Sequence, residues 1–532
     1  MKLNKILLSG VVAAMALSSC SDEFLDTAPT ESISTPDVFS STDNVKLAVN
    51  GIALLMCKQH AAFAQGCCGE NYITSIYNEY PSQEFRYNQF ASGWSVIMNG
   101  KYYDRTTSRY CRYAWAYYYE IIANANSIIA NVDNAEGLEK ERQFYKAQAL
   151  TFRAYSYMKL LELYTPRWQD TNNGASEGVV LRLDESIGSM PLSSVADCYA
   201  QIYADLDEAI ALFEESKLKR SATDVWLPNI NVAYGVYARA ALHKQDYTKA
   251  LETAKLARNG YKLMTNDEYV AGFATPTSEW LFGSYGDATE NQWYWSFGTQ
   301  FACNGYYASK TEYGAGAIEK ELTDRIPTND ARMGLFLTAD KFEGFDLSDT
   351  LVMNQTYGFI LSDDAWLTAE AYCNSRTPKG YEAPYKSGYY YLGAQLKFWV
   401  FGTPGVSYLP FMRSSEMVLI EAEANYFLGN TEAAQAALVE LNATSGRNPE
   451  YTCTKTGDEL FQEIVDYREL ELWGEGFNWY DYKRWNKDIV RKSFAEGGNS
   501  HVATAVTIKA DANNWSWAIP DVETLYNEDI EE

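Results

Sequence analysis

The sequence is poor in the residues and motifs that most enzymes use for catalysis. It contains only three histidines, His60, His243 and His501, and each stands alone in the chain. It has no Gly-x-Ser-x-Gly elbow, no phosphate-binding loop, no His-Glu-x-x-His zinc motif and no dinucleotide-binding glycine pattern. These absences argue against the common nucleophilic, metal-dependent and nucleotide-dependent reactions, and we predict that the protein is not an enzyme.

Carboxylates are abundant, and a glycosidase needs only two of them. However, Glu416, Glu421 and Glu423 fall on predicted scaffold helices, and Asp363-Asp364 has no distinguishing context. The hypothesis that the protein is a hydrolase would therefore rest on composition alone.

Positive charge is also in short supply. Lysine and arginine number 44 against 70 aspartates and glutamates, which gives a formal net charge of −26. Such an acidic chain is a poor partner for nucleic acid or for an anionic membrane surface, because like charges repel. The charge does not argue against a neutral ligand.

The nine cysteines match no zinc-site spacing, and no twelve-residue calcium loop is present. We therefore predict no metal and no cofactor, although acidic loops at 340–349 or at Asp363-Asp364 could hold a structural calcium ion. Apart from Cys20, the cysteines could form disulfides or remain as buried thiols. Adjacent Cys67 and Cys68 would pair outward, for example with Cys57 or Cys111.

The first residues form an export signal. Lys2 and Lys5 precede an apolar run at 6–17 that is too short to span a bilayer, and Leu17-Ser18-Ser19-Cys20 follows it. This arrangement resembles a bacterial lipobox, which implies removal of residues 1–19 and acylation of Cys20; the alternative is an ordinary secretory signal with a chance cysteine. Two acyl signals on one residue give stable anchoring.

Two stretches show the pattern of a tetratricopeptide-type helix hairpin. In 413–447 the two helices meet at Leu428-Gly429-Asn430, and in 231–260 they meet at Gln245-Asp246-Tyr247. Because one hairpin cannot bury its apolar face alone, more are expected, and 141–164 and 193–213 also read as helices. Small residues should allow close helix packing at Ala422, Ala424, Ala433, Ala434, Ala436 and Ala437, and at Ala238, Ala241, Ala250, Ala254 and Ala257.

Aromatic residues make up 15% of the chain and gather in three irregular segments between the helices. The segments lie at 72–103, 280–307 and 381–391, and glycine or proline interrupts each of them or borders it. Loops of this length in a compact protein are usually functional or disordered, and their many rings favour order. An exposed ring can stack on the apolar face of a pyranose while neighbouring amides and charges bind its hydroxyls.

Several segments, in a fixed order, carry a family resemblance. They are Phe24-Leu25-Asp26-Thr27-Ala28-Pro29-Thr30, Trp115 to Asn126, Phe152-Arg153-Ala154-Tyr155, Arg413-Ser414-Ser415-Glu416 with Glu421 to Ala424, Arg468 to Leu472 with Gly476, Tyr480 to Trp485, and Trp517-Ala518-Ile519-Pro520 with Glu523. Together with the lipobox they resemble the SusD/RagB family of surface nutrient-binding lipoproteins of Bacteroidetes. The chain departs from that pattern at Phe152, where leucine is commoner, and at Phe477, where arginine is commoner.

The resemblance implies a mostly α-helical fold, a tetratricopeptide-like scaffold of about four helix pairs with long aromatic-rich loop insertions that form the ligand face. It implies a signal peptide at 1–19, a lipidated Cys20 with a tether to residue 40, and a single domain at 41–532. We expect scaffold helices at 41–60, 112–131, 139–165, 193–216, 229–258 and 413–446. The ligand-face insertions are expected at 66–110 and 265–412, followed by a C-terminal segment at 458–532.

The resemblance also implies a function: capture of an oligosaccharide or polysaccharide at the cell surface and delivery to a TonB-dependent SusC-like transporter. Ser21-Asp22-Glu23 resembles the acidic signal that sends such lipoproteins to the outer face of the outer membrane. By resemblance, the candidate stacking residues are Tyr77, Tyr80, Tyr87, Trp94, Trp293, Tyr294 and Tyr306, and the polar candidates are Arg86, Asn88 and Asn291. Each ring could instead belong to the core. Two other functions remain open, a SusD-like binder of peptides or glycoproteins and a tetratricopeptide adaptor that binds only proteins.

Overall fold

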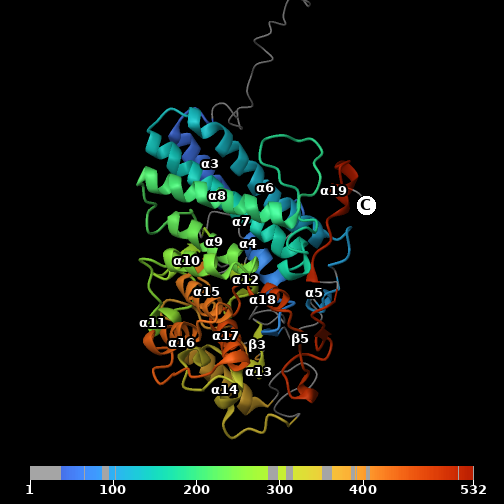
Figure 1. Cartoon of the computed structure of the whole chain (residues 1–532). Coiled ribbons are helices and arrows are strands. Elements are labelled where there is room, and N and C mark those ends of the chain that lie inside the picture. Colours follow the sequence, from blue (N-terminus) through green and yellow to red (C-terminus); the bar gives the residue numbers. More distant parts are fainter. Residues whose placement is uncertain are drawn as a thin grey trace, which may run out of the picture.

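The computed structural model describes residues 38–60, 62–64, 66–86, 95–101, 103–285, 297–306, 316–349, 362–384, 390, 392–402, 408–512 and 515–530. Cys20 and the tether lie outside these ranges. Helices dominate the described chain and its strands are short (Figure 1). The predicted fold class, a mostly α-helical scaffold of stacked helix pairs with long insertions, is confirmed.

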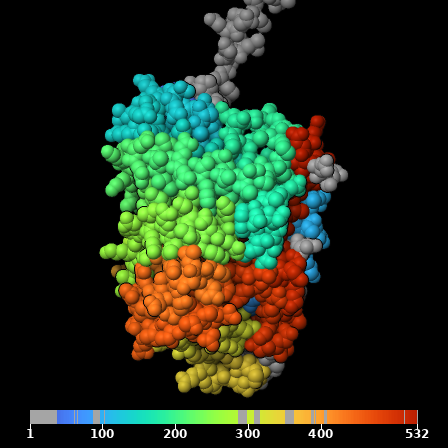
Figure 2. All heavy atoms as spheres, in the orientation of Figure 1, coloured from blue at the N-terminus to red at the C-terminus, as the bar shows by residue number. Residues whose placement is uncertain are grey.

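The helices of the scaffold stack one after another along the molecule (Figure 1). In chain order they are α3 (Thr42–Leu55), α6 (Arg109–Asn131), α7 (Glu139–Tyr164), α8 (Val195–Ser216), α9 (Ile230–His243), α10 (Tyr247–Ala257), α15 (Ser414–Phe427), α16 (Thr431–Val439) and α17 (Gly457–Leu472). Each of α6 to α10 packs on the next, and α15 packs on α10 although residues 258–413 separate them in sequence. The two lie side by side in Figure 2 as the light green and orange layers.

Helix α8 shows how local sequence sets these elements. The hydroxyl of Ser194 accepts a hydrogen bond from the amide of Asp197 and so caps the first turn. Ile202, Leu206 and Phe213 are buried on one stripe that packs on the neighbouring helices. The helix ends at Lys217 in the left-handed conformation.

The predicted hairpins form, but their alanines do not all serve as close contacts. In α9 and α10 all five predicted alanines are buried. In α15 and α16 the chain reverses at Gly429, whose φ of +78° favours glycine. Ala433 and Ala436, predicted to face a second helix, are exposed to solvent because they lie on the outer side of α16.

Residues 66–86, predicted to belong to the ligand face, are instead part of the core. They form α4 (Glu70–Tyr72) and the π-helix η2 (Ile73–Glu79), all of whose residues are buried. The carboxylate of Glu70 accepts hydrogen bonds from the hydroxyls of Tyr117, Tyr118 and Tyr155 at 2.6 to 3.1 Å. These bonds hold α4 against α6 and α7.

Among the described residues there are three two-stranded antiparallel sheets, and two of them connect distant parts of the chain. They pair β1 (Phe85–Arg86) with β3 (Ala317–Ile318), β2 (Trp280–Gly283) with β4 (Pro410–Arg413), and β5 (Ile489–Val490) with β6 (Thr507–Ile508). Trp280 lies opposite Arg413, so the large insertion leaves and re-enters the scaffold through one strand pair. Part of it has a small core of its own, to which α14 (Asp363–Ser375) contributes.

The remaining elements are short and lie mostly in the insertions and the C-terminal segment. They are α5 (Ser95–Met98), η4 (Val132–Asn134), η5 (Trp168–Asp170), α11 (Asn266–Tyr269), α12 (Phe297–Gln300), α13 (Lys320–Thr323), η7 (Ala331–Leu335), η8 (Ala339–Phe342), η9 (Glu440–Thr444), α18 (Asn478–Trp485), η10 (Phe494–Glu496) and α19 (Asp521–Tyr526).

A set of buried charges fastens the insertion to the scaffold, and we call it the buried ion cluster. Arg413 lies at its centre, with Nη1 2.5 Å from Glu279 and 3.0 Å from Glu471 and with Nη2 2.7 Å from Glu475. Its members are almost wholly inaccessible to solvent. They are the cations Arg332, Lys397, Arg413 and Arg447 and the carboxylates Glu279, Asp330, Glu471 and Glu475. The four positive and four negative charges balance.

The described cysteines and acidic side chains bear on the disulfides and the metal site considered from the sequence. Cys67, Cys198, Cys303 and Cys373 are buried thiols outside disulfides. Within the described ranges, no three or more histidine, cysteine or acidic side chains gather closely enough to hold a metal ion. No helix in these ranges is long and apolar enough to cross a membrane.

Candidate ligand-binding surfaces

Of the ten predicted ligand contacts, the structure describes Tyr77, Tyr80, Arg86 and Tyr306. The other six lie outside the described residues; they are Tyr87, Asn88, Trp94, Asn291, Trp293 and Tyr294. The predicted lipidation site Cys20 also lies outside them.

Tyr77 and Tyr80 are core residues and present no ring face to solvent. The Tyr77 hydroxyl donates to the Tyr110 carbonyl at 2.6 Å, and its ring lies 4.7 Å from that of Trp517. The Tyr80 ring stacks on Phe85 at 5.2 Å. We therefore remove both from the candidate contacts: the π-helix that carries them is enclosed by the scaffold helices.

Arg86 is also buried and has a structural role. Its Nη1 donates to the carbonyls of Gln83 and Phe85, and its Nη2 lies 3.6 Å from Glu319. Glu319 directly follows β3, so Arg86 ties its own strand to the partner strand. We therefore also remove Arg86 from the candidate contacts, because its side chain is buried as those of the two tyrosines are.

The three aromatic segments predicted from sequence are nonetheless anchored at one place. Arg86 pairs with Ala317 in the β1–β3 sheet, the Ile318 amide donates to the Gly393 carbonyl at 2.9 Å, and the Gln395 amide donates to the Gly316 carbonyl at 3.2 Å. We call the residues 85–86, 316–318 and 392–395 the stem platform. In the chain, it directly precedes residues 87–94 of the first segment and directly follows Tyr391 of the third. The second segment, 280–307, meets it through Phe301.

A stack of aromatic side chains supports the platform from below. The ring of Phe85 lies parallel to those of Phe301 and Trp473, at 5.5 and 5.7 Å. The side-chain amide of Gln395 donates a hydrogen bond to the Phe301 carbonyl at 2.8 Å. The platform is therefore a rigid base, because its backbone and the rings below it are held from several directions.

A stacked pair of rings lies in the same insertion as residues 392–395 of the platform. Tyr381 and Phe401 stack at 4.3 Å with an interplanar angle of 20°, and Phe401 is 45% exposed whereas Tyr381 is half-buried. The side-chain amide of Asn304 donates to the carbonyls of residues 382 and 400, so it links this pair to the chain that leads to half-buried Tyr306. Sequence reasoning missed Phe401, which lies outside the three aromatic segments although Phe398 and Trp399 closely precede it.

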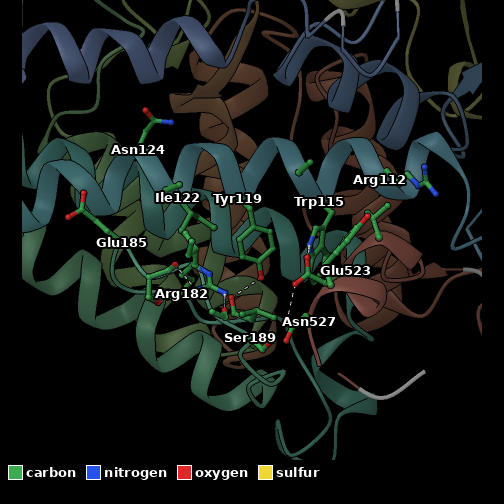
Figure 3. Close-up of a pocket in the computed structure, with 18 of the residues that line it drawn as sticks. Arg112, Trp115, Tyr119, Ile122, Asn124, Arg182, Glu185, Ser189, Glu523 and Asn527 are labelled. Carbon is green, nitrogen blue, oxygen red and sulfur yellow. Dashed lines mark hydrogen bonds between the residues drawn. The ribbon is translucent and has the colours of Figure 1, made fainter. Parts of the chain in front are cut away.

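A separate groove runs along α6 (Figure 3), with a cavity volume of about 1030 Å³. Trp115 and Tyr119 line it from α6, and its walls are residues 182–189 and α19. The Trp115 indole N–H donates to Glu523 at 3.1 Å, and Arg112 pairs with Asp521 at 2.7 Å. These contacts hold α19 beside α6.

The rim of this groove is apolar at two exposed positions. Ile187 is 100% exposed and Tyr526 is 84% exposed. The sequence analysis named Trp115 and Tyr119 only as scaffold motif residues and did not predict the groove. The walls lie more than three hundred residues apart in the chain, and no local signal connects them.

Two family models match the chain, one toward each end. A model described as the SusD family matches residues 384–529. A model described as "starch-binding associating with outer membrane" matches residues 23–242. No curated protein matches the sequence.

Solved structures from Bacteroides share the fold. A SusD-like carbohydrate binding protein from Bacteroides vulgatus is 20% identical with a TM-score of 0.73, and the match covers 92% of this chain and 98% of that one. A SusD superfamily protein from Bacteroides thetaiotaomicron is 21% identical with a TM-score of 0.68, over 92% and 99% of the two chains. One from Bacteroides fragilis is 19% identical with a TM-score of 0.65, over 93% and 100%. At these identities the likeness concerns the fold. The family models, supported by that fold, show that the chain belongs to the SusD family of carbohydrate-binding proteins, which are not enzymes.

Proposed function

We propose that this protein is a cell-surface lipoprotein that captures a glycan near the stem platform and delivers it to a SusC-like TonB-dependent transporter. The observation that carries the proposal is the anchoring of three aromatic-rich segments on one small rigid base. Rings that are scattered in the sequence can then act together on one ligand. Membership of the SusD family supports the choice of a glycan as that ligand.

Binding would use stacking and hydrogen bonds without covalent chemistry. A flat ring accepts the C–H face of a pyranose, and amide groups around it bind the hydroxyls. Tyr306, Tyr381 and Phe401 are the described rings that suit this role. From the segment joined to the platform at Arg86 we add the stacking candidates Tyr87 and Trp94 and the polar candidate Asn88. The stacking candidates Trp293 and Tyr294 and the polar candidate Asn291 come from the family resemblance, and they belong to the segment that meets the platform at Phe301.

The remaining parts of the proposal concern location and partner. The lipobox and Cys20 support a lipid anchor in the outer membrane, and Ser21-Asp22-Glu23 supports exposure to the exterior. A tether that reaches residue 40 would let the folded part lie over a transporter and close upon it. The domain division, with residues 41–532 as one unit, belongs to the same proposal.

The test is retention of the soluble chain from Ser21 onward in native gels that contain one polysaccharide each, from a panel of plant and host glycans. We expect one glycan to retard the parent protein. Phe401→Ala and Trp293→Ala should each weaken retention by about ten-fold, because each removes one ring from a multi-ring contact. Melting temperatures should stay within a few degrees of the parent's.

Tyr526→Ala is the matched control, since it removes an exposed ring from α19, which lies far from β3 (Figure 1). Retention of that variant should equal the parent's. If Phe401→Ala, Trp293→Ala and Trp94→Ala all bind the glycan as the parent does, the ring assignment is wrong. If no glycan retards the parent, the ligand class is wrong.

A protein or peptide ligand is the second candidate, and the groove along α6 favours it. Ile187 and Tyr526 are exposed apolar side chains on the rim of this concave groove, and a bound peptide could bury both of them. Given the net charge of −26, a basic peptide is the expected ligand. Saturable binding of basic peptides that Ile187→Ser abolishes, without glycan retention, would favour this function over glycan capture.

A further inference from the structure

Another cavity, partly open to solvent, lies among the ends of three scaffold helices. It is bounded by the end of α8, the start of α9, the end of α10 and the residues that lead into β2, and its volume is about 670 Å³. Phe144, Phe213, Tyr261 and Trp280 supply apolar surface. We call it the α8–α10 cavity. Its size is that of a site for a small organic ligand.

The charge at this cavity is opposite to that of the whole chain. Lys217, Lys219 and Arg220 line it, together with one carboxylate, that of Glu214. Lys217 and Lys219 are exposed, and neither has a carboxylate partner among the described residues. In a chain with a net charge of −26, a cluster of three cations without ion pairs is an exception that calls for a physical reason.

Arg220 is the most informative of the three. Its guanidinium donates to the carbonyls of Val225, Leu227 and Leu281 and to the Tyr261 hydroxyl, and within the described ranges no carboxylate lies at ion-pair distance. Burial lowers its pKa below the usual range, since desolvation outweighs the nearby groups. Arg491 is buried with carbonyl acceptors in the same way, whereas buried Arg239 pairs with Glu416 at 2.8 Å.

An unused hydrogen-bond donor borders the same cavity. Trp280 lines it and is only 1% exposed, yet its indole N–H has no acceptor within hydrogen-bond distance among the residues that the structure describes. Buried donors are nearly always paired, and an unpaired one costs about 1–3 kcal/mol of desolvation. The first turn of the 14-residue helix α9 also meets the cavity, at residues 229–231, and a helix N-terminus favours negative charge.

We propose that the α8–α10 cavity binds an anionic group, a carboxylate or a sulfate, carried on a sugar ring. An anion there would neutralise the unpaired cations, and the sugar's apolar face would pack on Tyr261 while Asn229 and Asn231 meet its hydroxyls. The inference is independent of the proposed function, because it concerns other residues and a different ligand chemistry.

Isothermal titration of the soluble chain from Ser21 onward tests it with three probes: trigalacturonate, the neutral galactotriose of equal length, and inorganic sulfate. We expect trigalacturonate to bind at least about ten-fold more tightly than galactotriose, with an affinity that falls as salt is added. If sulfate binds and trigalacturonate does not, the cavity takes a free anion, and the proposal of an anion carried on a sugar ring is wrong.

Two variants locate the site. Lys217→Gln with Lys219→Gln should weaken anion binding by about ten-fold or more, and Trp280→Phe should weaken it while keeping an aromatic ring in place. The matched control is Lys46→Gln with Lys140→Gln, which removes two exposed lysines elsewhere and should leave the affinity unchanged. The lysine pair is at the surface, so its variant should fold even if Trp280→Phe does not.

Three results overturn the proposal: no binding of either anion, equal binding of trigalacturonate and galactotriose, or an affinity that the lysine pair at the cavity and the control pair reduce equally. None of these results bears on the proposed role of the rings at the stem platform. A loss of glycan retention in Phe401→Ala with intact anion binding, or the reverse, separates the two sites.

Discussion

Neutralising one carboxylate of the buried ion cluster should destabilise the whole protein. Glu471 touches three guanidiniums, with oxygens 3.0 Å from Arg332, Arg413 and Arg447. Burial alone would raise its pKa, but the three arginines outweigh burial and hold the pKa of Glu471 well below its usual value. Its contribution to stability is therefore present above the ordinary carboxylate pKa and is lost only as the pH falls through the depressed value. At neutral pH the full charge is present.

The size of the effect follows from the balance of the cluster. Glu471→Gln keeps the side-chain volume and one hydrogen-bond acceptor but leaves four buried cations with three carboxylates. Breaking a buried ion pair costs about 3–5 kcal/mol. For a chain of roughly 500 residues, an unfolding entropy of about 2.1 cal/mol/K per residue gives about 1 kcal/mol/K, so we expect the melting temperature to fall by about 3–5 °C.

Scanning calorimetry of the soluble chain measures this, with Glu440→Gln as the control. Glu440 also pairs with an arginine, Arg258, but is 36% exposed, and such a pair is worth less than about 1 kcal/mol. If Glu471→Gln melts within a degree of Glu440→Gln, the charges of the cluster are not balanced as argued.

Three further predictions concern packing, pH and thiol access. Gly235→Ala should lower the free energy of unfolding by about 1–3 kcal/mol, because the new methyl group would lie 2.1 Å from Met412 Sδ. Gly51→Ala places its methyl group in open space and should stabilise α3 by about 0.5–1 kcal/mol. Urea unfolding of both variants and the parent measures the two changes. Burial raises the pKa of Glu79 to about 7 from 4.5, so the stability it contributes is full at acid pH and is lost as the pH rises through about 7. The melting temperature should fall between about pH 4.5 and about pH 7, where the folded state keeps a proton that the unfolded state has lost, and Glu79→Gln should flatten that profile. A thiol reagent should modify half-buried Cys453 in the native protein well before the buried thiols, and simultaneous modification of all would contradict the described burial.

Much of the scaffold could be predicted because its signals are local. The cap at Ser194, the buried stripe of α8 and the turn at Gly429 each depend on residues within a few positions of one another. Helical periodicity indicates which face of such a helix is buried. It does not indicate whether a small residue beside that face meets a neighbour, and Ala433 and Ala436 of α16 face solvent instead.

The candidate site was harder to predict because a ring looks the same in sequence whether it is buried or exposed. Tyr77 and Tyr80 belong to an aromatic-rich, interrupted segment, yet both are buried in the core, in the π-helix and at its end. Phe398 and Trp399 are buried, yet Phe401, which closely follows them, is exposed and stacks on Tyr381. Ring exposure depends on contacts between segments that are far apart in the chain.

The sequence by itself determined that this chain is mostly helical, built from repeated helix pairs, rich in rings between them and a member of the SusD family. Those properties depend on short-range patterns and on ordered motifs. Only the tertiary structure decided that parts of three distant segments meet at one base, that Arg86 serves the fold, and that three cations with no ion pair among the described residues border one cavity. Each of these depends on which remote residues meet, and long-range contacts have no fixed spacing in the sequence.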